Sequence, residues 1–321
     1  MNELRELIDR EIGNMNFSGR LPAELYRPVE YVMSIGGKRV RPVLCLMACK
    51  VFSDNPGPAV KPATAIEIFH NFTLIHDDIM DKATLRRNKP TVHKKWNENV
   101  ALLSGDAMAV LSFGLISSAG QEILPALLRV FNRTALEVCE GQQMDMNFES
   151  MPEVSEELYL EMIRLKTSVL IAAAMKIGAL CGGASEKDAS LMYDAGMNLG
   201  LGFQLQDDLL DLYGNQEEFG KTEGGDIILN KKTFLMISAL AKAKGDTAGR
   251  LRELINREND PQVKIREIKK IYDTLGIKEI TESRAAGFFA LSMQKLDQAS
   301  PPASRKTGLT SFIETVRKRK A

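Results

Sequence analysis

Two acidic motifs of the pattern DDxxD stand in separate apolar segments of this sequence, at Asp77–Asp81 and Asp207–Asp211. Residues four apart on an α-helix lie about 40° apart around its axis and one turn along it, so the outer carboxylates of each motif form a pair on one face. Such a pair repels itself unless a cation joins it, and Mg²⁺ takes one or two carboxylates together with water and phosphate oxygens. The motifs therefore predict two carboxylate pairs that hold Mg²⁺ around a diphosphate. A single motif would equally suit a solvated helix end.

Positive charge follows the first acidic motif. A group of basic residues within 18 residues of Asp77 comprises Arg86, Arg87, Lys89, His93, Lys94 and Lys95. A run of positive charge is most often a solvated surface. Beside a metal-binding carboxylate pair, however, it suits an anionic substrate.

The segment Gly36–Pro42, with the sequence GGKRVRP, places two glycines and three cations ahead of an apolar run. This pattern predicts a loop that opens a helix. Glycine lets the backbone approach an anion closely, Lys supplies a point charge, and Arg supplies a planar fork that matches phosphate oxygens. The start of the helix adds its positive dipole. The segment thus predicts a phosphate-binding loop, although the spacing of a Walker loop is absent.

Taken in order, the motifs resemble those of the trans-isoprenyl diphosphate synthases, the polyprenyl synthetase family. They are GGKRVRP, HNFTLIHDDIMD, RRNKPTVH, RLKTSVL, GFQLQDDLLD, FGKTEGGD and NKKTF. The resemblance spans about residues 26–234, and the rest of the C-terminal third carries little diagnostic pattern. It implies an all-α fold of the isoprenoid synthase type, a single large bundle of about 10–13 helices around a central cavity. Residues 1–321 would form one isoprenyl diphosphate synthase domain.

The resemblance also implies an activity, that of a Mg²⁺-dependent prenyltransferase. Such an enzyme condenses isopentenyl diphosphate head-to-tail with dimethylallyl, geranyl or farnesyl diphosphate by ionisation, condensation and proton elimination. Breaking a C–O bond to diphosphate requires that the charge on the leaving group is neutralised, which metal ions and cationic side chains can do. The alternative is a class I terpene cyclase, which would share the first acidic motif but would not need the cations of Gly36–Arg41.

Individual roles follow from the resemblance, motif by motif. The metal ligands would be Asp77, Asp81, Asp207 and Asp211, supported by Asp78 and Asp208. The allylic diphosphate and its surroundings would be contacted by Arg86, Lys166, Thr167, Gln204, Lys221 and Lys231. Isopentenyl diphosphate would be held without metal by Lys38, Arg41, His70 and Arg87. The catalytic residues would be Asp77, Asp81, Asp207, Lys166, Lys221 and Gln204.

Two of these assignments have structural alternatives. A lone histidine on an apolar helix is more often a hydrogen-bonded core residue than a ligand, but His70 lies about 20° from Asp77 on the helical wheel, on the same face. Lys166 and Thr167 lie in an amphipathic stretch, where a lysine can simply be solvated.

Product length in the resembled family depends on bulky residues just before the first acidic motif. Here Phe72 and Thr73 stand five and four residues before Asp77. This combination is similar to synthases of the geranylgeranyl (C20) type, with farnesyl (C15) as the alternative product. Phe72 lies about 140° from Asp77 on the wheel, however, and Phe69 about 80°. The floor of the product tunnel could therefore be Phe69 or a neighbouring helix.

Composition agrees with a helical enzyme of balanced charge. The 42 basic residues match the 42 acidic ones, which disfavours nucleic-acid binding. Alternating strand patterns are nearly missing, and no Pro/Gly/Ser-rich linker divides the chain. Helices of about 22 residues or more are predicted by periodicity at Asn97–Ser118, Glu122–Asn147, Glu156–Leu180 and Glu186–Tyr213.

The N-terminal segment is charged throughout and lacks the apolar stretch of a signal peptide. The sequence contains no charge-free apolar stretch of about 18 residues, so we expect no stable membrane insertion. Four cysteines in apolar segments, without CxxC spacing, predict reduced core thiols. We therefore expect a cytoplasmic enzyme, and the family resemblance implies a homodimer.

Overall fold

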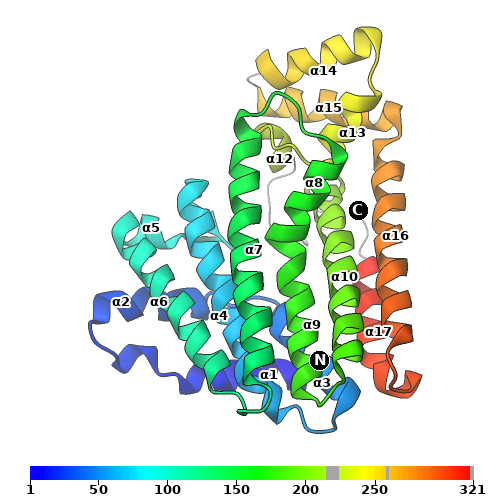
Figure 1. The fold of residues 1–321 in the computed structure, drawn as a ribbon. Coiled ribbons are helices and arrows are strands. Elements are labelled where there is room, and N and C mark those ends of the chain that lie inside the picture. Colours follow the sequence, from blue (N-terminus) through cyan, green and yellow to red (C-terminus); the bar gives the residue numbers. More distant parts are fainter. Residues whose placement is uncertain (215–223, 258–259, 319–321) are drawn as a thin grey trace. The chain divides into compact units, whose positions relative to one another are not determined.

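The computed structural model describes residues 1–214, 224–257 and 260–318, and its regular elements are almost all helices (Figure 1). The elements up to the middle of the chain are α1 (Asn2–Asn14), η1 (Phe17–Gly19), α2 (Ala23–Ser34), α3 (Val40–Phe52), α4 (Gly57–Met80), β1 (Leu85–Arg86), β2 (Lys89–Pro90), α5 (Val92–Lys95), α6 (Glu98–Ser117) and α7 (Leu124–Ser150). The elements that follow are α8 (Glu156–Ile163), η2 (Arg164–Ser168), α9 (Val169–Cys181), α10 (Glu186–Tyr213), α12 (Gly225–Ile228), α13 (Phe234–Lys242), α14 (Gly245–Arg257), α15 (Pro261–Leu275), α16 (Ile277–Gln298) and α17 (Ala303–Arg317).

The all-α prediction is confirmed, and three of the predicted long helices, α6, α7 and α10, begin and end close to their predicted residues. The segment 156–180 differs, because a π-helical turn, η2, separates α8 from α9. The helices also outnumber the predicted ten to thirteen, since short segments such as α5 and α12 form helical turns. Strands β1 and β2 form a small antiparallel hairpin that no strand pattern predicted.

Side-chain caps fix where several helices begin. The Asn97 side chain accepts a hydrogen bond from the Val100 amide at the start of α6, and Ser155 accepts one from the Leu158 amide at the start of α8. Asp260 caps α15 in the same way. Each cap satisfies an amide that has no partner inside its helix, which stabilises the start by about 1 kcal/mol.

The chain divides into two compact units, each made of several segments. The first unit comprises Met1–Arg133, Ala173–Tyr193 and Ala299–Leu309. The second unit comprises Thr134–Ala172, Asp194–Gln298 and Thr310–Ala321. The prediction of one domain over residues 1–321 stays a prediction.

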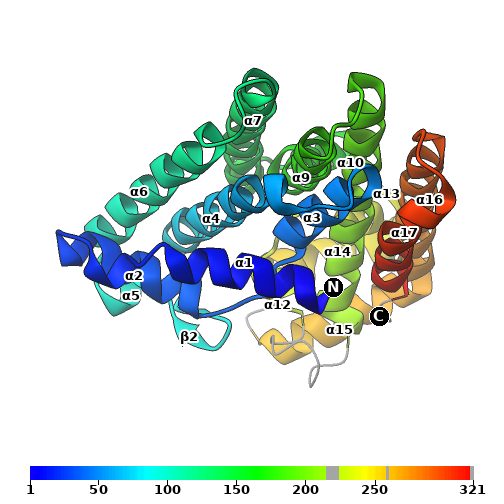
Figure 2. The ribbon, with the colours of Figure 1, turned by 90° about the horizontal axis from the view of Figure 1, so that it is seen from below.

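The core of the first unit surrounds α4. This helix packs against α6 and α3, and α1 lies against both α3 and α4 (Figure 2). A buried apolar cluster joins α2, α4 and α6 and includes Val29, Ile68, Ile75 and Met108. Because α4 carries the first acidic motif, this core fixes the helix on which Asp77 stands.

The core of the second unit encloses the C-terminal end of α10. Leu209 and Leu212 are buried against Met236 of α13 and Tyr272 of α15. Helices α14 and α15 also pack against each other. Since Leu209 lies between Asp207 and Asp211, the apolar side of α10 is held by α13 and α15, and its acidic side faces elsewhere.

The turn η2 is packed tightly between two glycines of the second unit. A Cβ atom on Gly141 of α7 would lie 2.7 Å from the Leu165 carbonyl carbon, and one on Gly200 of α10 would lie 2.6 Å from the Ser168 Cα. Only glycine permits these approaches. The backbone of η2 is thus held from two sides by neighbouring helices.

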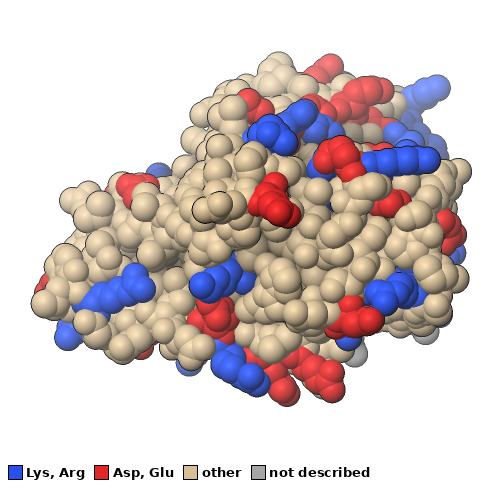
Figure 3. Space-filling model, turned by 60° about the horizontal axis from the view of Figure 1, so that its bottom comes forward, with Lys and Arg blue, Asp and Glu red and all other residues tan. Residues whose placement is uncertain are grey.

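Two predictions from the sequence concern the surface, namely balanced charge and no stable membrane insertion. Basic and acidic side chains are interspersed among uncharged ones on the face drawn in Figure 3, in agreement with the balanced composition. Helix α6 is long and apolar enough to cross a membrane by length and composition, and 33% of its most apolar window is buried. The charge-free part of this helix begins only at Ala107, after Asp106, and is therefore shorter than 18 residues.

The cysteine prediction needs one correction. Cys45 and Cys49 are buried and Cys181 is partly buried, whereas Cys139 is exposed. The apolar neighbours of Cys139 suggested a core position, but its side of α7 faces solvent.

Replacement of Gly141 by Ala should destabilise the protein, because the added methyl group would collide with the backbone of η2. We expect a loss of about 1–3 kcal/mol in the free energy of unfolding, measured by urea denaturation. The matched control is Gly249→Ala on α14, where nothing lies within 4 Å of the added Cβ. That control should gain about 0.5–1 kcal/mol. Equal effects of the two substitutions would contradict the packing argument.

Candidate active site

The first acidic motif lies at the C-terminal end of α4 and is linked to the hairpin by Arg86. Asp78 is buried and accepts hydrogen bonds from Nε and Nη2 of Arg86 at 2.7–2.9 Å. The same guanidinium lies 3.9 Å from Asp77 Oδ2. Burial raises the pKa of Asp78, although the Arg86 hydrogen bonds act in the opposite direction. Asp78 therefore anchors Arg86 next to Asp77, and the supporting role predicted for Asp78 in metal binding stays a prediction.

Arg87 joins the hairpin to the glycine- and cation-rich segment Gly36–Arg41, which we call the basic loop. Its Nη1 donates a hydrogen bond to the Gly36 carbonyl. Its guanidinium also covers Gly37, where a Cβ atom would lie 2.7 Å from Nη1. Gly37 has φ +142°, in a region that favours glycine. Both observations explain the glycine at this position, and they bring two of the predicted phosphate-binding segments together.

Arg41 and His70 lie side by side in the first unit and, with the nearby Arg87, form a cluster of basic side chains that we call the basic pocket. Arg41 Nη1 lies 3.1 Å from His70 Nε2, and because Arg only donates, Nε2 accepts and Nδ1 carries the proton. Burial, followed by the charges of Arg41 and Arg87, holds the pKa of His70 well below its usual range. Burial lowers the pKa of Arg41 to about 10. At neutral pH the pocket thus holds a cationic Arg41 and a neutral His70 with one N–H to donate.

The second acidic motif lies near the end of α10, and its second aspartate, Asp208, is buried. Asp208 accepts hydrogen bonds from the Tyr159 hydroxyl, from Gln204 Nε2 at 3.1 Å and from the Phe234 amide at 3.4 Å. Burial raises the pKa of Asp208 to about 8, and the nearby Asp226 carboxylate contributes. Asp208 is therefore held within the core by three hydrogen bonds, and its supporting role in metal binding stays a prediction.

Asp211 has a structural partner that the sequence did not predict. Its Oδ2 accepts a hydrogen bond from the Asp226 amide at 3.1 Å, and its carbonyl accepts one from the Gly224 amide at 2.8 Å. These bonds hold the start of α12 against the end of α10. One oxygen of Asp211 is thus engaged with the backbone of α12.

The turn η2 presents Lys166 and Thr167 to their partners in the second unit. Lys166 Nζ lies 2.6 Å from Asp145 Oδ2 of α7. The Thr167 hydroxyl donates to Gln204 Oε1 at 3.1 Å, and Gln204 in turn donates to Asp208. Turns of the π type are frequent at functional sites. The structure therefore connects Thr167 and Gln204 to the second acidic motif through one chain of hydrogen bonds.

Two further functional candidates were missed by sequence reasoning. Asp145 is a single acid between Met144 and Met146, a signal that could have marked it as a buried or paired carboxylate. Tyr159 gave no signal, because its hydrogen bond to Asp208 joins residues far apart in the chain.

Three further lysines, Lys38, Lys221 and Lys231, were predicted to contact the substrates. Lys38 and Lys231 are exposed, and the Lys231 amide donates to the Asp226 carbonyl at 2.9 Å. Lys221 lies outside the described residues. The neighbouring Lys232 is used structurally, because its ammonium binds the carbonyls of Phe148 and Met151.

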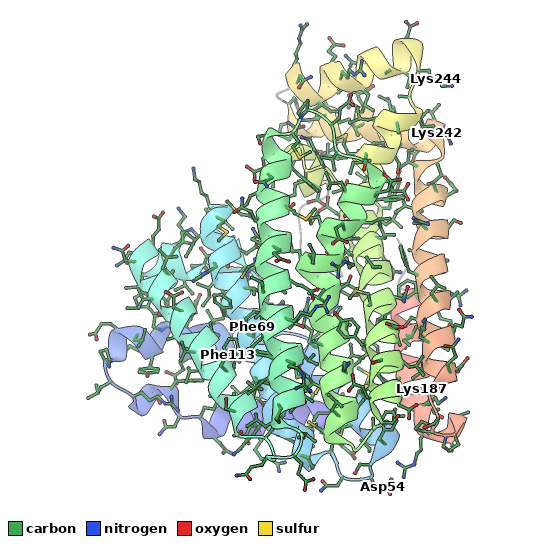
Figure 4. The ribbon with its side chains drawn as sticks, in the orientation of Figure 1. Asp54, Phe69, Phe113, Lys187, Lys242 and Lys244 are labelled. Atoms are coloured by element: carbon green, nitrogen blue, oxygen red, sulfur yellow. The ribbon has the colours of Figure 1, made fainter. Side chains whose placement is uncertain are left out.

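The predicted chain-length residues belong to an aromatic cluster of the first unit, which we define as Phe69, Phe72, Phe113 and Phe131. Phe69 contacts Phe72 and Phe131 with ring centroids 5.3 and 5.4 Å apart, and Phe113 contacts Phe131 at 5.0 Å. Figure 4 shows Phe69 and Phe113 in the same region of the unit. Phe72 also stacks on His76. Thr73 donates to the His70 carbonyl and lies outside the cluster.

The donor chemistry of the acidic motifs fits Mg²⁺ that is completed by substrate. Within residues 1–214, 224–257 and 260–318, no group of three or more His, Cys, Asp or Glu side chains is arranged to hold a metal ion. The motifs instead offer carboxylate pairs on single helices. Because Mg²⁺ is commonly bound by one or two carboxylates plus phosphate oxygens, such pairs suit it.

Comparisons with known proteins agree with this chemistry. A family model described as Polyprenyl synthetase matches residues 22–275. The geranylgeranyl diphosphate synthase of Methanosarcina mazei is 44% identical over 223 residues, 69% of each chain. The short chain isoprenyl diphosphate synthase of Methanothermobacter thermautotrophicus is 36% identical over 298 residues, 92% of this chain and 91% of the relative. A crystal structure of a geranylgeranyl pyrophosphate synthase is similar with a TM-score of 0.93 and 41% identity, over 100% of both chains.

Asp208 should make the stability of the metal-free protein depend on pH. Its pKa is about 8 in the folded protein and about 4 in the unfolded chain, so the folded state keeps a proton that the unfolded state releases. This contribution is complete below about pH 4 and is lost as the pH rises to about 8. We expect the free energy of unfolding in EDTA to fall by a few kcal/mol between about pH 5 and pH 8 because of this group.

Urea denaturation of Asp208→Asn over the same pH range provides the check. The variant should show a flatter dependence than the parent, whatever its absolute stability. The control Asp106→Asn replaces an exposed carboxylate and should leave the slope unchanged. An unaltered slope in Asp208→Asn would show that this group is ionised in the folded protein.

Proposed function

Because this chain belongs to the polyprenyl synthetase family and is a prenyltransferase, we propose that it condenses isopentenyl diphosphate with an allylic diphosphate to give geranylgeranyl (C20) diphosphate. The proposal is supported by two neighbouring groups of charged and polar side chains on α4. His70 stands beside Arg41 in a basic pocket, and the Asp77–Asp81 motif follows about 10 Å along the same helix. A condensation of two diphosphates requires two such anion sites at short distance, one of them with metal.

The residues of the basic pocket would bind isopentenyl diphosphate. Arg41 and Arg87 are cationic guanidinium groups with the planar geometry that phosphate oxygens prefer. The Nδ1–H of neutral His70 would donate a further hydrogen bond to the diphosphate. The exposed Lys38 would bind the same diphosphate through its ammonium group. A neutral His70 is a donor without being an acid, so it would orient the diphosphate and leave its protonation unchanged.

The allylic diphosphate would be bound with metal. Mg²⁺ held by Asp77, Asp81, Asp207 and Asp211 would neutralise the charge that develops on the leaving diphosphate. Arg86 lies beside Asp77 and would add a cation to the same oxygens. Lys166, Thr167 and Gln204, with Lys221 and Lys231, would contact this substrate or the cation formed from it. Asp145 would hold Lys166 in place through their ion pair.

Product analysis by mass spectrometry tests the proposal directly. The purified protein is incubated with Mg²⁺, labelled isopentenyl diphosphate and, in turn, dimethylallyl, geranyl or farnesyl diphosphate. We expect a C20 diphosphate from each starter. A C15 diphosphate would support the synthase reaction with a shorter product. A cyclic hydrocarbon from an allylic diphosphate alone would replace the proposal with a terpene cyclase.

Asp77→Ala should lower turnover by about 100-fold or more, because the leaving diphosphate would lose one of its metal ligands. The measurement is the rate of product formation at saturating substrates, together with circular dichroism to verify the helical fold. Glu98→Ala, a change of an exposed acid at the start of α6, is the control and should keep normal turnover. Normal turnover in folded Asp77→Ala would remove the metal assignment.

The aromatic cluster would form the floor that ends chain growth. Phe72→Ala opens space next to Phe69, so its products should be longer than those of the parent by at least one C5 unit. The product distribution is measured with farnesyl diphosphate as starter. If Phe72→Ala leaves the distribution unchanged while Phe69→Ala lengthens it, the floor is Phe69 and its partner Phe131.

We also propose a cytoplasmic homodimer, supported by an exposed apolar stripe on α6. Leu103 and Val110 are 60% and 71% exposed, and they lie seven residues apart on one face with Leu102, 43% exposed, beside them. Large exposed apolar patches on a soluble protein commonly mark an interface. A second copy of this chain would cover the stripe and account for the apolar character of α6 without a membrane.

Val110→Asp should shift the protein from dimer to monomer, because a charge would be buried in the contact. Light scattering after size-exclusion chromatography should then give a mass near 35.6 kDa. Leu85→Asp alters an equally exposed leucine on the hairpin and should leave the dimer intact. A dimer that persists in Val110→Asp would place the interface elsewhere.

A further inference from the structure

Arg39 lies within the basic loop next to Lys38. The side chain of Lys38 is exposed, whereas that of Arg39 is buried. It is only 6% exposed and has φ +48°, in the left-handed region that residues with a Cβ rarely adopt. Its guanidinium donates to Glu67 Oε1 at 2.7 Å, to Asp9 Oδ1 at 3.2 Å and to the Met33 carbonyl at 2.9 Å. Arg39 thus ties the loop to α4, α1 and the end of α2 at once.

Glu67 is the buried partner of Arg39 and is itself fixed on both sides. It is 2% exposed, and Oε1 also accepts a hydrogen bond from Asn71 Nδ2 at 3.2 Å. It stands three residues before His70 on α4, so it lies about one turn below the basic pocket. Its negative charge acts on Arg41 and Arg87, whose cationic forms it stabilises. Glu67 is therefore a carboxylate placed among the pocket's cations, with its own position fixed by Arg39.

The backbone conformation of Arg39 determines where the loop's other cations lie. A left-handed residue reverses the local direction of the chain, and here it stands directly between exposed Lys38 and the first turn of α3, which carries Arg41. This conformation is unfavourable for an arginine in isolation. The three hydrogen bonds of the guanidinium stabilise it. If they were lost, Lys38 and Arg41 would no longer be held in a fixed relation.

We propose that Arg39 and Glu67 are positioning residues that hold the basic loop in the conformation that binds isopentenyl diphosphate. The inference rests on the proposed function, because it requires that the pocket of Arg41 and His70 takes this substrate. Neither residue is proposed to touch it. Their effect is exerted through the backbone of the loop and through the orientation of Arg41.

The decisive variant is the double substitution Arg39→Met/Glu67→Met. Loss of one partner deprives the other of its buried counter-charge, which destabilises a protein, whereas apolar replacement of both often does not. The double change also removes one positive and one negative charge, so the net charge of the pocket is conserved. We expect the KM for isopentenyl diphosphate to rise at least 10-fold, while the KM for the allylic diphosphate stays within about 2-fold.

Two further variants separate positioning from charge and from stability. Glu67→Gln removes a negative charge near an anion site, so a purely electrostatic role would lower the KM for isopentenyl diphosphate, whereas a positioning role raises it. Lys306→Met removes another buried cation of the first unit, one whose ammonium binds the Ala299 carbonyl at 2.6 Å. It should lower the thermal midpoint but leave both KM values unchanged. Arg39→Lys keeps the charge without the fork and should give an intermediate KM.

Calorimetric titration with isopentenyl diphosphate in the absence of Mg²⁺ gives a readout independent of turnover. The double variant, verified as folded by circular dichroism, should bind at least 10-fold more weakly than the parent. Equal binding and an unchanged KM in the double variant would overturn the inference while leaving the proposed function intact. If the parent protein itself neither binds nor consumes isopentenyl diphosphate, the proposed function fails and the inference fails with it.

Discussion

Burial of an ionised side chain is unfavourable unless an opposite charge or several donors accompany it, and helix α4 meets this requirement twice. Glu67 is buried against Arg39, and Asp78 is buried against Arg86. Each pair joins α4 to a segment that would otherwise be a surface loop. The basic loop and the hairpin thus owe their positions to carboxylates on one helix, and Arg87 then connects the two segments to each other.

The second unit satisfies the same requirement differently. In the part of the chain that the structure describes, Asp208 accepts hydrogen bonds from a tyrosine hydroxyl, a glutamine amide and a backbone amide. Burial, together with the nearby Asp226 carboxylate, raises the pKa of Asp208 to about 8, and the hydrogen bonds from Tyr159 and Gln204 offset this rise only in part. The two acidic motifs share one sequence pattern, yet their second aspartates, Asp78 and Asp208, are held by different interactions. The repeated sequence pattern alone does not predict this difference between Asp78 and Asp208.

Much of the fold and part of the site could be predicted because they depend on local spacing. The i, i+4 carboxylate pairs and the long helices α6, α7 and α10 follow from periodicity within one segment. The network of Arg39 with Glu67 and Asp9 could not be predicted, since it joins three segments and depends on a backbone angle that arginine seldom adopts. The partnership of Asp211 with α12 and the hydrogen bond of Tyr159 to Asp208 are likewise long-range. Short helices such as α5 escaped prediction because they are too brief to be stable without tertiary contacts.

The π-helical turn η2 also sets a limit on how the gene for this protein can change. A π turn holds one more residue than an α turn, so the helical phase of α9 is offset by about 100° from a continuous extension of α8. Deletion of a single codon within residues 164–168 would convert the turn to an ordinary helix and rotate Lys166 or Thr167 away from their partners on α7 and α10. The backbone of η2 could not shift to restore these contacts, because Gly141 and Gly200 already approach it closely from two sides. The length of this segment is therefore constrained as strictly as its chemistry, and single-residue insertions and deletions should be absent there even when neighbouring loops vary freely.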